Sequence, residues 1–226
     1  MRRNLIVPQE VFRDIVRLVT QTPSGLETGI TLFGTSLESG LDYVVLAVAG
    51  PGRGATHEPG HYSGDENHAS AIYRALGSAM PRISWLGELH VHPRGMTWLS
   101  AGDRRTVRQL LIGVPGTAPR DEFIAGVMQR RNGTVDLYPV YFTRECMEGR
   151  DMELRIAGAE AQVLQQARQK VIEPGEKDDR RSRIHPEPEG SRAAVRKARR
   201  FRWLRQWRER FGAYGLKVRR RKIHAD

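Results

Sequence analysis

The segment Gly87–Thr106, GELHVHPRGMTWLSAGDRRT, constrains this chain more than any other part of its sequence. Its apolar start predicts a strand that ends in His90 and His92, and side chains two residues apart on a strand point to the same face. Both imidazoles can therefore bind one ion, and Asp103 can supply a third ligand after one turn of the chain. Three nitrogen or oxygen ligands with one open position are typical of catalytic zinc. The segment predicts a Zn²⁺ ion bound by His90, His92 and Asp103.

The spacing of these residues, His-x-His, seven residues, Ser, two residues and Asp, resembles the JAMM motif of the JAB/MPN metalloprotease family. That family also has a glutamate at the start of an upstream strand, in the pattern E-x-x-G-x-L-x-G. Leu26–Gly34, LETGITLFG, is similar to this pattern and offers Glu27, one residue out of the usual spacing. The resemblance covers roughly residues 8–145. It implies an α/β fold in which helices flank a deaminase-like mixed central sheet, with the metal at the edge of the sheet.

The resemblance also implies an activity, the hydrolysis of amide or isopeptide bonds at the C-terminus of a ubiquitin-like protein. Glu27 would be the catalytic carboxylate that takes a proton from the attacking water and passes it to the leaving amine. Ser100 would donate a hydrogen bond to the oxyanion, although its position equally suits a helix N-cap, and one hydroxyl can do both. Glu88 is an alternative to Glu27, but it shares a strand face with the two histidines, which equally suits a buried partner of the metal ligands.

Two short segments narrow the resemblance to one group of the family. The G-P-G loop at Gly50–Gly52 and the strand G-E-L-H-V-H-P resemble JAB peptidases of bacterial ubiquitin-like conjugation systems. The implied substrate is a ubiquitin-like precursor or conjugate, and the implied partners include E1-like and E2-like enzymes.

The single cysteine, Cys146, excludes an intramolecular disulfide and leaves histidine and aspartate as the metal ligands. This composition suits a reducing cytosol, and the sequence predicts a cytoplasmic protein. No apolar run approaches the roughly 18–20 residues of a membrane span. The N-terminus MRRNLIVPQEVF lacks the apolar core and cleavage site of a signal peptide.

Positive charge is concentrated at the C-terminus. The chain has a formal net charge of +11, and residues 191–226 hold 14 Lys and Arg against only Glu209 and Asp226. Arginines that alternate with Trp203 and Trp207 can bind nucleic acid, an acidic protein or an anionic membrane surface. A helix that packs its tryptophans on the rest of the protein explains the pattern equally well. A binding or scaffold protein of MPN fold, acting through this tail, is therefore the alternative to an enzyme.

Periodicity and turn residues predict the order of the elements along the chain. Expected helices cover 8–20, 65–80, 100–111, 157–171 and 193–211; expected strands cover 29–34, 43–48, 82–91, 123–128 and 135–142. Residues 49–64 and 93–99 are expected to be loops, and a hairpin is expected to turn at Asn132-Gly133. The sequence thus predicts a metalloprotease domain over 1–171, a charged linker over 172–192 and a basic tail over 193–226.

Three more histidines, His57, His61 and His68, lie in and after the Gly-rich loop. Solvated loop histidines are the simpler interpretation, and a second metal site is the alternative. Trp98, between the His-x-His pair and Ser100, is a candidate for one wall of the substrate site.

Overall fold

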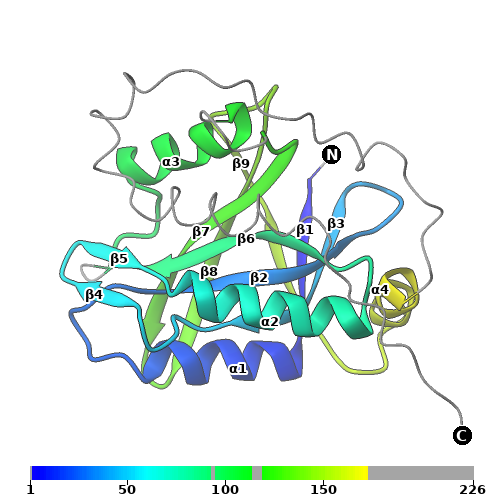
Figure 1. Ribbon diagram of the computed structural model, residues 1–226, viewed down its shortest axis with the longest axis horizontal. Coiled ribbons are helices and arrows are strands. Elements are labelled where there is room, and N and C mark those ends of the chain that lie inside the picture. The colour runs from blue at the N-terminus through cyan, green and yellow to red at the C-terminus, as the bar shows by residue number, and fades with distance from the viewer. Residues whose placement is uncertain (1, 93–94, 114–118, 173–226) are drawn as a thin grey trace, which may run out of the picture.

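A mixed sheet of eight strands forms the centre of the protein (Figure 1). The computed structural model describes residues 2–92, 95–113 and 119–172. In spatial order the strands are β10 (Glu153–Ala157), β1 (Asn4–Pro8), β3 (Asp42–Ala49), β2 (Thr28–Ser36), β6 (Ser84–Val91), β7 (Glu122–Arg131), β8 (Thr134–Thr143) and β9 (Arg150–Asp151). Neighbours pair antiparallel except for β10 with β1, β1 with β3, and β6 with β7, which are parallel.

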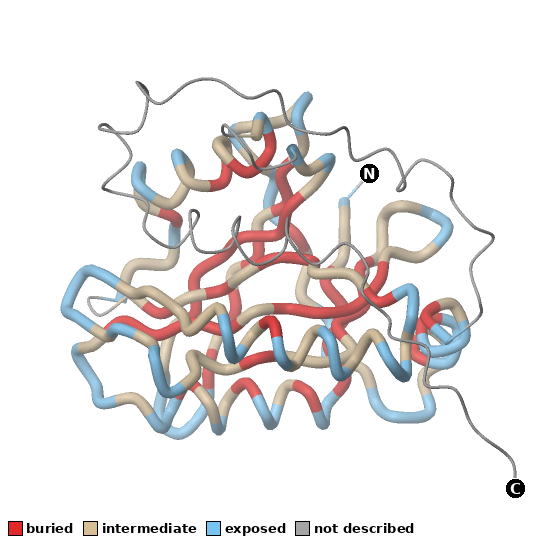
Figure 2. Tube along the Cα trace, viewed as in Figure 1, coloured by how far each residue is buried: buried red, intermediate tan, exposed pale blue. Residues whose placement is uncertain are grey.

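In the described part of the chain, four helices cover this sheet, and each packs apolar residues against it. Figure 2 shows the buried residues of the helices and the sheet in red. They are α1 (Gln9–Thr20), α2 (Glu66–Ala79), α3 (Ala101–Ile112) and α4 (Gln162–Ile172). On α1, Val11, Ile15 and Val19 are buried, as a period of 3.6 residues requires. Helix α2 packs over β2 and β3, helix α3 packs over β7 and β8, and a cleft lies between the two helices.

The mixed α/β fold and most of its elements are confirmed. Asp65 caps α2, because its carboxylate accepts hydrogen bonds from the N–H groups of Asn67 and His68. The hairpin between β7 and β8 turns at Asn132 and Gly133, which both have positive φ angles of 32° and 84°. These elements were predictable because their signals are local.

Four strands contradict the expected boundaries. Residues 49–64 are not simply a loop, because β4 (Thr56–Glu58) and β5 (His61–Ser63) form a small hairpin. The helix expected over 157–171 begins at Gln162, because Glu153–Ala157 pairs with β1 as a strand. Strand β1 itself runs straight into α1 at Pro8, whose φ of −56° suits both elements. All of these strands have five residues or fewer and show no clear alternation.

Most of the expected linker and all of the expected tail helix lie outside the described residues. The division into a domain, a linker and a tail, and the partners expected for the tail, therefore stay predictions. None of the described helices is long and apolar enough to cross a membrane.

The sheet curls until strands from its two halves touch. Tyr43 of β3 and Tyr141 of β8 both donate a hydrogen bond to Glu122 Oε2, at 2.6 and 2.8 Å, and their hydroxyl oxygens lie 3.1 Å apart. Burial, together with the hydrogen bond to Glu122, raises the pKa of Tyr43 far above its ordinary value. The two tyrosines therefore stay neutral donors and close the sheet on itself.

Replacing Tyr43 with phenylalanine should lower the free energy of unfolding by about 1.5–3 kcal/mol, the range for a hydrogen bond to a charged group. Chemical denaturation measures this change. Tyr138→Phe is the matched control, because the Tyr138 hydroxyl makes only a long hydrogen bond of 3.4 Å to Gln129. Equal losses in the two variants would show that the contact between the sheet halves adds nothing.

Candidate metal centre

Strand β6 and the start of α3 bring the candidate ligands together. His90 and His92 lie on one face at the end of β6, and Asp103 lies in the first turn of α3. The Ser100 hydroxyl accepts a hydrogen bond of 3.2 Å from the Asp103 N–H, and the Ser100 N–H donates one of 2.7 Å to Asp103 Oδ2. This is a capping box, with aspartate in place of the usual glutamate. It fixes both the start of the helix and the ligand carboxylate.

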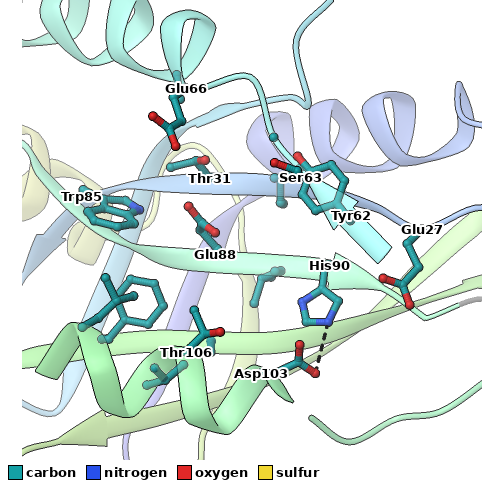
Figure 3. Close-up of a pocket in the computed structure, with 18 of the residues that line it drawn as sticks. Glu27, Thr31, Tyr62, Ser63, Glu66, Trp85, Glu88, His90, Asp103 and Thr106 are labelled. Carbon is teal, nitrogen blue, oxygen red and sulfur yellow. Dashed lines mark ion pairs between the residues drawn. The ribbon is translucent and has the colours of Figure 1, made fainter. Parts of the chain in front are cut away.

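Three side-chain atoms, from His90, His92 and Asp103, form a small triangle at this point. Figure 3 shows one side of it, between His90 and Asp103. The Nε2 atoms of His90 and His92 lie 3.1 Å apart, and Asp103 Oδ2 lies 3.5 Å from the first and 3.4 Å from the second. Ligands at about 2.0–2.1 Å from a tetrahedral zinc ion are separated by about 3.3–3.4 Å. The donor set and its spacing therefore fit a metal ion without rearrangement.

The charges of these groups are strongly coupled. Burial raises the pKa of Asp103, but hydrogen bonds from His90, His92 and Ser100 outweigh it and hold this pKa well below its usual range. The hydrogen bond to Asp103 in turn raises the pKa of His92, against the opposite effect of burial. A histidine that binds a metal must be neutral, so protonation of His92 would compete with metal binding.

Glu27 lies on the other side of His92 from Asp103. Its buried carboxylate places Oε1 3.3 Å from His92 Nδ1. The backbone of Glu27 is held by the β4–β5 hairpin, because its N–H donates to the carbonyl of Glu58 at 3.1 Å and its carbonyl lies 2.8 Å from His57 Nδ1. A carboxylate on the second ring nitrogen of a ligand histidine fixes the tautomer and the orientation of the ring. The hairpin thus positions Glu27, and Glu27 positions His92.

The structure brings all five predicted residues to one place, and Glu88 lies beside them. Glu27, His90, Ser100 and Asp103 line one cleft of about 640 Å³ between α2 and α3, which Glu88 also lines. Burial raises the pKa of Glu88 to about 7, although His90 and Arg120 act against this shift. Figure 3 shows the side chains of His90 and Glu88 pointing into the same cleft from β6.

The other sequence candidates have different outcomes. His57 contacts Glu27 as described, whereas His61 and His68 are exposed, so the three histidines form no second cluster. Within the described residues, the group of His90, His92 and Asp103 is the one whose atoms are close enough to hold an ion. Trp98 is 61% exposed and does not line the cleft. The contact of His57 with Glu27 had no local signal, because it joins a loop to a distant strand.

Fold and site together describe a mixed α/β protein with a three-residue centre able to hold a metal ion. No family model matches the chain, and no curated protein matches it. Among solved structures, it resembles the solution structure of protein DSY2949 from Desulfitobacterium hafniense, with a TM-score of 0.51 and 14% identity. The similarity covers 68% of this chain and 93% of that chain. At this identity the likeness concerns the fold alone.

Proposed function

We propose that the protein is a zinc-dependent peptidase or isopeptidase of the JAB/MPN kind. Its substrate would be an amide or isopeptide bond at the C-terminus of a ubiquitin-like protein, in a bacterial ubiquitin-like conjugation system. The observation that carries the proposal is the triangle of ligand atoms at tetrahedral spacing, open to a cleft and flanked by the separate carboxylate of Glu27. A purely structural zinc site would use four protein ligands and no open position.

Each residue has a distinct part in the proposed reaction. A zinc ion bound by His90, His92 and Asp103 would supply hydroxide at neutral pH and polarise the scissile carbonyl. Glu27 accepts a proton from the attacking water and delivers it to the leaving amine. The Ser100 hydroxyl accepts its capping bond from the Asp103 N–H, so its own proton is available to the developing oxyanion.

The direct test is hydrolysis by the purified full chain loaded with one equivalent of zinc. The substrates are bacterial ubiquitin-like domains fused at their C-termini to a fluorescent protein, and mass spectrometry locates the cut. We expect cleavage directly after the ubiquitin-like domain, loss of cleavage with a chelator, and recovery when zinc is restored. A protein that binds no zinc, or that binds zinc and cleaves none of the fusions, would contradict the proposal.

A further inference from the structure

Glu88 lines the same cleft as the candidate metal ligands His90 and Asp103. It precedes His90 by two residues on β6, so the two side chains share a face and their Cα atoms are separated by about 6.6 Å. Across the sheet it is paired with Thr31 of β2, which also lines the cleft. Figure 3 shows Glu88 between Thr31 and His90, on the floor between the two helices. Helix–sheet interfaces are normally apolar, and this polar floor is an exception.

The Glu88 carboxylate makes no hydrogen bond or ion pair with any residue that the structure describes. Arg120, the nearby cation, is engaged elsewhere: it donates to the Trp85 carbonyl at 2.6 Å and lies 4.4 Å from the centre of the Trp85 ring. A half-buried carboxylate without a hydrogen-bond partner is costly, and the nearby His90 and Arg120 offset only part of the effect of burial on Glu88. Such a group in a cleft beside a metal centre is a candidate for binding a ligand.

The charge of the whole cleft also favours the binding of a ligand at Glu88. Five carboxylates line it, and the lining arginines are Arg105 and Arg120. These acidic residues are Glu27, Asp65, Glu66, Glu88 and Asp103. An ion with two positive charges at the metal centre still leaves the cleft with a net negative charge. The complementary ligand is therefore cationic.

We propose that Glu88 forms a specificity subsite that binds the cationic side chain of an arginine or lysine close to the scissile carbonyl. The basic residue would be the one that carries this carbonyl or the one before it, because an extended chain advances about 3.3–3.6 Å per residue. This inference rests on the proposed function and specifies its substrate. The predicted substrate tail enters the cleft along β6, with its carbonyl at the metal centre and its positive charge at Glu88.

Binding of short peptide hydroxamates tests the subsite without requiring catalysis. The hydroxamate group binds zinc, and calorimetry on the zinc-loaded full chain measures the affinity. The probes are acetyl-Arg hydroxamate and acetyl-Arg-Gly hydroxamate, each compared with its citrulline counterpart, which has nearly the same shape without the charge. We expect at least one arginine probe to bind about tenfold more tightly than its citrulline counterpart, in the range for a hydrogen bond to a charged group.

Substitutions at Glu88 assign the preference to this residue. In Glu88→Gln the affinities of the arginine and citrulline probes should become equal, while the zinc content stays at the wild-type level. Glu66→Gln is the matched control, because it removes one negative charge from the α2 wall of the same cleft, and it should retain the preference.

The outcomes separate the subsite from the proposed function. Equal binding of the arginine and citrulline probes by the wild type, or a preference that survives Glu88→Gln, overturns the subsite. An arginine preference in a protein that cleaves no fusion supports the subsite and contradicts the peptidase. A chain that binds no zinc overturns both.

Discussion

Replacement of His90 by alanine should abolish both zinc binding and hydrolysis. His90 supplies one of three ligand atoms in a triangle whose sides are 3.1–3.5 Å, and the two that remain cannot close a three-ligand site. Loss of an outer-shell partner alone typically lowers metal affinity or activity by about 10–100-fold. Loss of a ligand should therefore exceed about 100-fold in affinity, measured by competition with a chromogenic chelator.

Thermal unfolding gives a second measure of the same change. An ion that binds only the folded state raises the unfolding midpoint, so zinc should stabilise the wild type but not His90→Ala. His68→Ala is the matched control, because His68 is exposed on α2 and lies away from the candidate ligands. Full zinc binding by His90→Ala would show that the ion lies elsewhere, and equal losses in both variants would show a nonspecific effect.

The second large effect is expected at Glu27. Two substitutions there separate its proposed role as a proton acceptor from its contact with His92. Glutamine in place of Glu27 can still accept a hydrogen bond from His92 Nδ1, but it cannot take up a proton at neutral pH. Glu27→Gln should therefore keep its zinc and lose about 10²–10⁴-fold in kcat, the usual contribution of general acid–base catalysis.

Leucine at the same position removes both the proton acceptor and the partner of His92. Glu27→Leu should lose as much activity and also bind zinc about 10–100-fold more weakly, since the ring of His92 is no longer held. Zinc titration and single-turnover cleavage of a ubiquitin-like fusion measure the two effects. If Glu27→Gln retains full activity, another group takes the proton, and Glu88 is then the first residue to examine.

The metal centre could be predicted from the sequence because its geometry is local. His90 and His92 need only a strand, and Asp103 needs only the helix that Ser100 begins three residues earlier. The spacing therefore determines the triangle almost without reference to the rest of the fold. A close grouping of these residues was predicted and is confirmed, whereas the identity of the metal stays a prediction.

The role of Glu27 could not be derived in the same way, because it depends on the register between two strands. Thr28 pairs with Val91 and Gly29 with His90, and this alignment places Glu27 next to His92. Gly29 itself has to be glycine, since a Cβ atom there would lie 2.3 Å from the ring of Tyr62. No local pattern encodes that contact, because Tyr62 belongs to a hairpin of two three-residue strands that the sequence did not reveal.

Because Asp103 belongs both to the capping box and to the ligand triangle, the lifetime of an ion bound there would depend on the fraying of α3. Opening of the first turn breaks both Ser100–Asp103 hydrogen bonds and carries the carboxylate away from the histidines. An ion in place opposes this opening, so amide hydrogens at the start of α3 should exchange with solvent more slowly in the metal-loaded protein. Escape of the ion and local unfolding of this turn are then one kinetic event.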